Sequence, residues 1–144
     1  MNIGQAAKRS GISAKMIRYY EDIDLLPNPK RSDSGYRIYS DDDIKTLSFI
    51  QHARELGFSS KQMKELLGLW QNDARHSSDV KQLAQKHIEL LQQKISDMQN
   101  MMKILQQSVA QCAGDEQSDC QILKQIEQGV SHGKTAHTAI KADQ

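Results

Sequence analysis

The chain has 144 residues, of which 38% are hydrophobic and 5% aromatic. This composition excludes a large globular core and favours one small domain with an extended element. The formal net charge of +1 is uninformative, but the two ends differ. Residues 1–39 hold seven Lys and Arg against four acids, net +3, whereas residues 111–144 hold three Lys against five acids, net −2. We therefore expect any contact with nucleic acid at the N-terminal end.

The sequence also argues against several classes of protein. It contains no stretch of about 18 apolar residues, so we predict no membrane span, and its first residues lack the apolar core of a secretory signal. The protein is therefore expected to be cytoplasmic, where Cys112 and Cys120 would stay reduced. It carries neither a Gly-x-x-x-x-Gly-Lys nucleotide loop nor a metalloprotease His pair, so we predict that it is not an enzyme.

The first segment is predicted to be a helix-turn-helix. Asn2 is expected to cap a helix that ends near Ser10, and Ser13 to cap a second helix that runs to about Asp24. Pro27 cannot continue that helix and is expected to end it. A helix, a short glycine-containing turn and a helix form the helix-turn-helix pattern, although an ordinary helical hairpin has the same spacing.

A small β-wing and two further helices are predicted next. Residues 30–39 combine turn chemistry with strand-forming residues and three cations, which indicates a wing. Ser40 is expected to cap a third helix that Gly57 ends, with one apolar stripe: Ile44, Leu47, Ile50, Ala53 and Leu56. Ser59 or Ser60 is expected to cap a fourth helix, with apolar residues Met63, Leu66, Leu67 and Trp70.

A long helix is predicted from about Ser78 to Val109, where Gly and Pro are absent. Its apolar residues recur in alternating steps of four and three, a sustained heptad: Ala84, Ile88, Leu91, Ile95, Met98, Met102, Leu105 and Val109. At 1.5 Å per residue this helix is roughly 45 Å long. A small N-terminal domain cannot cover such a seam, so we expect a coiled-coil homodimer; packing against the same chain is the alternative.

The second helix and the wing carry the candidate DNA contacts. Lys15, Arg18 and Tyr19 fall near the start of that helix, where a recognition helix meets base edges. Arginine can pair bidentately with guanine, whereas lysine and tyrosine more often bind phosphate. Tyr36 and Arg37 on the wing are suited to contacts with the DNA backbone. The competing interpretation is that these are solvated surface residues.

Two cysteines form the candidate sensor. Cys112 and Cys120 end a nine-residue stretch in which Gly114 allows a turn, so the two sulfurs could converge. Cys120 precedes a predicted helix over residues 121–128, and a helix N-terminus stabilises thiolate, a soft ligand that suits Cu(I). Two cysteines alone are a weak metal signal because zinc prefers four ligands. Further candidate ligands are His76, Asp115, Glu116 and Asp119, and the alternative is two small residues with no ligand role.

Three linked motifs resemble the MerR family of regulators: residues 16–21 (MIRYYE), residues 25–27 (LLP) and residues 35–39 (GYRIY). The resemblance covers residues 1 to about 128. It implies a mainly α fold with a winged helix-turn-helix at residues 1–70 and an antiparallel dimerisation helix at 77–110. A metal-binding loop and short helix would follow at 111–129, and residues 130–144 would form a polar tail.

The Cys-x7-Cys loop resembles the CueR-type, copper-responsive branch of that family. This resemblance implies that Cys112 and Cys120 hold one monovalent ion in a linear site, Cu(I) or the related ions Ag(I) and Au(I). Zinc- and mercury-responsive relatives have a cysteine of the other subunit at the position of Ser77. Lys81 matches the position expected to offset the net negative charge of a buried dithiolate site.

The resemblance implies a metal-responsive activator of metal-resistance genes. A homodimer would stay on a palindromic promoter, and the metal would order the loop and dock the last helix through Ile122, Leu123 and Ile126. The bent and untwisted spacer DNA, a deformation of several kcal/mol, would then suit RNA polymerase. A thiol redox sensor that forms a Cys112–Cys120 disulfide remains open, whereas the short C-terminus argues against a drug-sensing regulator.

Overall fold

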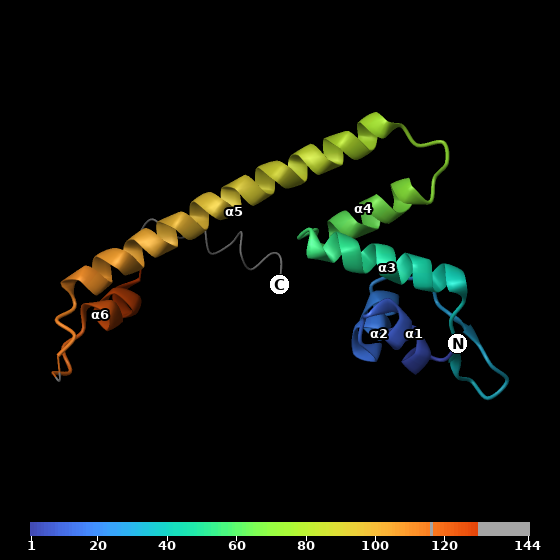
Figure 1. Ribbon diagram of the computed structural model, residues 1–144, viewed down its shortest axis with the longest axis horizontal. Coiled ribbons are helices and arrows are strands. Elements are labelled where there is room, and N and C mark those ends of the chain that lie inside the picture. Colours follow the sequence, from blue (N-terminus) through green and yellow to red (C-terminus); the bar gives the residue numbers. More distant parts are fainter. Residues whose placement is uncertain (116, 130–144) are drawn as a thin grey trace. The chain divides into compact units, whose positions relative to one another are not determined.

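A computed structural model describes residues 1–115 and 117–129. The predictions for Glu116, a candidate ligand, and for the tail at 130–144 lie outside the described residues. The described part forms six helices and one two-stranded sheet, which confirms the mainly α prediction (Figure 1). It divides into two compact units, residues 1–83 and the described residues from 84 onward. No helix in the described ranges is both long and apolar enough to cross a membrane.

The first unit begins with the predicted pair of helices. The side chain of Asn2 caps α1 (Ile3–Ser10) and that of Ser13 caps α2 (Ala14–Asp22), each by accepting a backbone N–H of the first turn. Between them Gly11 adopts a left-handed φ of 74°, which glycine tolerates at little cost. The predicted caps and the predicted end of α1 are confirmed.

The predicted end of α2 is wrong by two residues, and Pro27 does not cause it. The helix ends at Asp22, and Asp24 adopts a left-handed φ of 59°. The N–H groups of Leu25 and Leu26 then both donate to the carbonyl oxygen of Tyr20. Aspartate tolerates this conformation better than most residues, so the chain leaves the helical path before the proline is reached.

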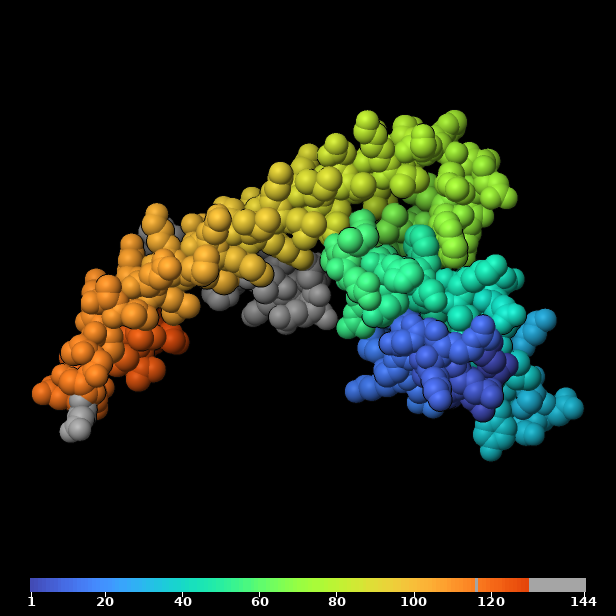
Figure 2. Space-filling model, viewed as in Figure 1, coloured from blue at the N-terminus to red at the C-terminus, as the bar shows by residue number. Residues whose placement is uncertain are grey.

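The predicted wing is an antiparallel hairpin of β1 (Lys30–Arg31) and β2 (Arg37–Ile38). Its turn is closed by a hydrogen bond of 2.9 Å from the Gly35 N–H to the Ser32 carbonyl oxygen. Gly35 has a φ of 86°, a conformation that favours glycine. In Figure 2 the wing, in light blue, projects from the helices of the first unit.

Two more helices complete the first unit. Ser40 caps α3 (Asp41–Glu55) and Ser59 caps α4 (Ser60–Trp70), as predicted. Helix α1 contacts α2 and α3, and α3 contacts α4, around one apolar core. The core consists of thirteen buried residues: Ala6, Ile12, Ile17, Tyr20, Leu25, Leu26, Tyr39, Ile44, Leu47, Ile50, Ala53, Met63 and Leu67.

The predicted apolar stripe of α3 is too long by one residue. Four of its five members are buried, but Leu56 is 66% exposed because the helix ends at Glu55 and Leu56 is its C-cap. Trp70 at the end of α4 is 39% exposed and stacks on Phe49, with ring centroids 4.3 Å apart. The helix ends, and not the periodicity alone, therefore set which apolar side chains reach the core.

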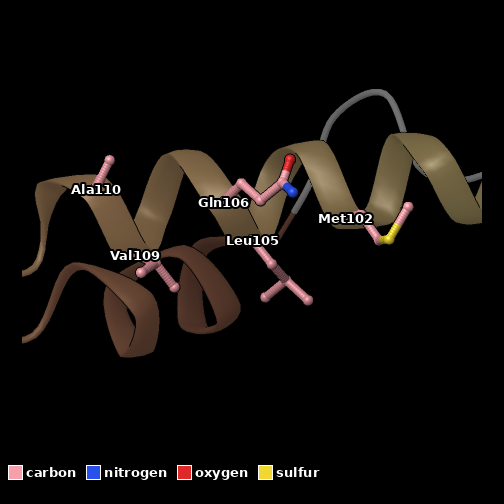
Figure 3. Close-up of a pocket in the computed structure, with 5 residues that line it drawn as sticks. All are labelled: Met102, Leu105, Gln106, Val109 and Ala110. Atoms are coloured by element: carbon pink, nitrogen blue, oxygen red, sulfur yellow. The ribbon is translucent and has the colours of Figure 1, made fainter.

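The long helix and the last helix are confirmed. Helix α5 (Ser77–Gln111) has 35 residues, and α6 (Gln121–Gln128) has the predicted bounds. Six heptad residues in the second unit are between 48% and 58% exposed: Ile88, Ile95, Met98, Met102, Leu105 and Val109. Figure 3 shows Met102, Leu105 and Val109 lining an apolar groove on α5.

Candidate DNA interface and metal site

Helix α2 presents the three predicted contact residues on its outer face. Lys15, Arg18 and Tyr19 are exposed, whereas Ile17 and Tyr20 are buried in the core. Positions 15, 18 and 19 lie on one side of a helix because they are separated by three and four residues. The core therefore fixes α2 with this polar face outward, an arrangement that fits a helix lying in the major groove.

The two predicted wing residues, Tyr36 and Arg37, differ in their exposure and in their contacts. Tyr36 is 74% exposed and lies at the end of the wing turn. Arg37 is only partly exposed, and its Nε donates a hydrogen bond of 2.9 Å to Oε2 of Glu21, with which it forms an ion pair. Arg37 is therefore held by the chain itself, whereas Tyr36 faces solvent.

Sequence reasoning missed Glu21, a buried carboxylate on α2. Its Oε1 accepts a hydrogen bond of 2.5 Å from the hydroxyl group of Tyr39, which is also buried. Burial, the hydrogen bond to Glu21 and the negative charge of Glu21 raise the pKa of Tyr39, and the cations Arg37 and Arg18 oppose this shift. The Tyr39 hydroxyl group therefore keeps its proton at neutral pH and donates it to the hydrogen bond with Glu21.

One sequence signal could have pointed to the cluster of Glu21, Arg37 and Tyr39. Arg37 and Tyr39 are two residues apart in an extended segment, so their side chains leave the backbone on the same face. An acidic residue among the apolar positions of the preceding helix could have been paired with them. The periodicity of α2 does not by itself show which segment covers Glu21.

The loop between α5 and α6 brings the two cysteines together. Cys112 follows the last residue of α5, and Cys120 is the N-cap of α6. Their Sγ atoms are 3.8 Å apart, and both side chains are half-buried. Gly114 takes a left-handed φ of 67° within the loop, as its predicted role in the turn requires.

The start of α6 favours the thiolate form of Cys120. The backbone N–H groups of Leu123 and Ile122 lower the pKa of the Cys120 thiol, and the Cys112 thiol adds to this effect. Desolvation and the carboxylate of Asp119 oppose it. The loop therefore places one thiol with a lowered pKa beside a second thiol.

The candidate ligands among the described residues, His76, Asp115 and Asp119, form no ligand group with these sulfurs. In residues 1–115 and 117–129 there is no group of three or more His, Cys, Asp or Glu placed to hold a metal ion. The carboxylate of Asp119 instead lies 2.7 Å from Nζ of Lys124. His76 and Ser77 lie at the beginning of α5, and Cys112 follows its end. Within the described part of one chain, the site consists of the two thiols.

Family comparisons match most of the chain. The family described as "MerR HTH family regulatory protein" matches residues 1–69, and the one described as "MerR, DNA binding" matches residues 44–108. The two matches include α2, the wing, α3, α4 and most of α5. They end before the cysteine loop.

Individual relatives extend the similarity through that loop. Heavy metal-dependent transcription regulator 2 of Rhizobium meliloti (strain 1021) is 50% identical over 129 residues, which cover 90% of this chain and 88% of the relative. The regulator CueR of Yersinia pestis is 39% identical over 126 residues, covering 88% and 91%. The crystal structure of PbrR691 from Ralstonia metallidurans CH34 in complex with lead(II) is similar with a TM-score of 0.74 at 26% identity, covering 86% and 97%.

Proposed function

Because the chain belongs to the MerR family of transcription regulators, we propose that it is a DNA-binding activator whose effector is Cu(I), held by Cys112 and Cys120. The observation that carries this proposal is the 3.8 Å separation of the two Sγ atoms, which places both within reach of one ion. Relatives named as heavy metal-dependent regulators support a metal effector. The resemblance to the copper-responsive branch and the similarity to a CueR regulator support copper.

The donor set fits a monovalent coinage-metal ion. Thiolates are soft ligands that suit Cu(I), and Ag(I) and Au(I) share this preference. Zinc in structural sites takes about four ligands, and the described residues offer two thiols without a third ligand nearby. When bound, the ion would join the end of α5 to the start of α6 through two metal–sulfur bonds.

The proposed site also depends on a second chain. The half-exposed seam of α5 would be covered in an antiparallel homodimer, which brings the start of one α5 toward the end of the other. Ser77 would then stand where zinc-type relatives supply a third thiolate, and Lys81 would offset the net negative charge of two thiolates and one Cu(I). Both residues lie in the first two turns of α5.

The proposed output is a change in promoter shape. Lys15, Arg18 and Tyr19 would contact the major groove, and the wing would contact phosphates of the same half-site. Leu123 and Ile126 are about two-thirds exposed on α6, so this helix has an apolar face available for docking. Docking would favour the dimer state that bends and untwists the spacer for RNA polymerase, which would switch on metal-resistance genes.

The test is transcription in vitro with RNA polymerase, from a promoter fragment that the wild-type protein captures out of genomic DNA of its source. Buffered Cu(I) or Ag(I) should activate the wild type, and Zn(II) should not. Cys112→Ser should abolish the response, whereas Ser118→Ala, a change in the same loop at an exposed position, should preserve it. Equal activation by Zn(II), or a full Cu(I) response in Cys112→Ser, would contradict the proposal.

The same sulfur separation favours a second candidate, a thiol redox regulator. Oxidation would join the two Sγ atoms in a disulfide, and an oxidant such as oxidised glutathione would take up the two protons and two electrons as two thiols. This candidate predicts that metal-free, oxidised protein activates transcription and that a reductant reverses the effect. The copper proposal predicts no activation under those conditions.

A further inference from the structure

One buried carboxylate links the helix α2 to the wing. Glu21 is the penultimate residue of α2, and its side chain is 4% exposed. Its two oxygens accept from different residues, Oε1 from the hydroxyl of Tyr39 and Oε2 from Nε of Arg37. Because both oxygens are occupied, the plane of the carboxylate is fixed relative to the wing.

The wing end of this link is anchored a second time through its backbone. The Tyr39 N–H donates to the carbonyl oxygen of Met1 at 2.7 Å, and the N-terminal ammonium of Met1 donates to the Tyr39 carbonyl oxygen at 3.0 Å. Tyr39 is also part of the apolar core. The base of the wing is therefore a rigid support for Arg37, two residues earlier.

Arg37 keeps donors for another ligand. Glu21 engages Nε, and a guanidinium carries further N–H donors on its Nη atoms. The side chain is 29% exposed, and its neighbour Tyr36 is exposed at the wing turn. A guanidinium held along one edge loses less conformational freedom when its other edge binds an anion.

We propose that Glu21 is a positioning residue for DNA binding, which holds Arg37 by Nε so that its Nη atoms meet a phosphate of the DNA backbone. This inference rests on the proposed role of α2 and the wing as the DNA reader. Arg18, the candidate base contact, lies one turn before Glu21 on the same helix. One carboxylate would therefore set the distance between the base-reading helix and a phosphate contact.

A positioning role for Glu21 and a role only in folding predict opposite changes in DNA affinity when its charge is removed. DNA is a polyanion, so a carboxylate near it weakens binding, and its removal should by charge alone strengthen binding. If Glu21 positions Arg37, its neutralisation releases Arg37 and weakens binding despite the more favourable charge. Asp22, exposed and adjacent on α2, offers a matched removal of one negative charge outside the cluster.

The experiment measures the affinity of the full chain for a duplex that the wild-type protein selects from a random-sequence pool, over a range of salt concentrations. Glu21→Gln and Arg37→Ala should each weaken binding about tenfold and reduce the salt slope by about one. Asp22→Asn should leave the affinity unchanged or raise it. In the Arg37→Ala background, Glu21→Gln should cause no further loss, because the two residues act through one contact.

Four results decide the outcome. Unchanged or stronger binding by Glu21→Gln, or an equal loss in the Arg37→Ala background, would overturn the positioning role. Unchanged binding by Arg18→Ala would instead show that the reader assignment itself is wrong. If Glu21→Gln fails to fold in a thermal unfolding assay, the variant Arg37→Lys is measured in its place. Lysine keeps the positive charge but lacks Nε and the planar guanidinium group. Arg37→Lys should then still weaken binding about tenfold, and wild-type affinity would overturn the proposal.

Discussion

The two functional regions of this protein differ in how much of each is complete in one chain. The DNA-binding unit has a closed core, four side-chain-capped helices and a carboxylate that fastens the wing. The α5–α6 region has a half-exposed apolar seam and two thiols in a loop. The DNA-binding unit is therefore preformed within one chain, whereas the sensing region is proposed to need a second chain and an ion.

The largest expected effect tests the incomplete region. Ile95→Glu places a charge in the middle of the proposed seam, where burial of an unpaired carboxylate is strongly unfavourable. We expect the dimer dissociation constant to rise by more than about a hundredfold, measured by sedimentation equilibrium. Asn100→Glu, on the side of the helix away from the seam, is the control and should leave it near the wild-type value. Monomeric wild-type protein, or an intact Ile95→Glu dimer, would contradict the proposal that the heptad seam of α5 is the dimer interface.

An intermediate effect is expected in the preformed region. Arg18→Ala should weaken binding to the selected duplex by about ten- to a hundredfold, because one bidentate arginine–base pair is lost. Cu(I) uptake, measured by competition with a chelator, should stay at the wild-type level. A simultaneous loss of uptake would show that the two regions cannot be assigned separate roles.

The smallest effect concerns the support beneath the wing. The raised pKa of Tyr39 means that the folded state keeps a phenol proton that the unfolded chain releases near pH 10. Its contribution to stability is therefore complete below pH about 10 and is lost as the pH rises further. The free energy of unfolding, measured with urea, should fall with pH above that value in the wild type and more shallowly in Tyr39→Phe. Tyr36→Phe, at an exposed phenol, should retain the wild-type slope; equal slopes in all three proteins would exclude the buried phenol as the cause.

Local signals in the sequence predicted most of the fold. Asn2, Ser13, Ser40 and Ser59 cap helices through contacts within three residues, so a short window contains the whole interaction. The heptad of α5 is likewise visible as a repeat. The end of α2 was mispredicted because the left-handed turn at Asp24 precedes the more conspicuous proline.

The candidate sites were predictable only in part, because some of their contacts join residues that are far apart in the sequence. The convergence of Cys112 and Cys120 follows from a short loop with a glycine, and the structure confirms it at 3.8 Å. Glu21 and Arg37 are 16 residues apart, and their pairing depends on how the wing folds back over α2. The charge of Arg37 indicates a surface contact. It does not by itself show that Glu21 of the same chain already binds this side chain.

X-ray absorption at the copper edge, on the full chain loaded with Cu(I), tests the proposed two-thiolate site most directly. We expect two sulfur neighbours around each copper ion and no nitrogen or oxygen ligand, with this signal lost in Cys120→Ser. A copper ion surrounded by three or more donors, or an unchanged spectrum in Cys120→Ser, would contradict a site made from Cys112 and Cys120 alone.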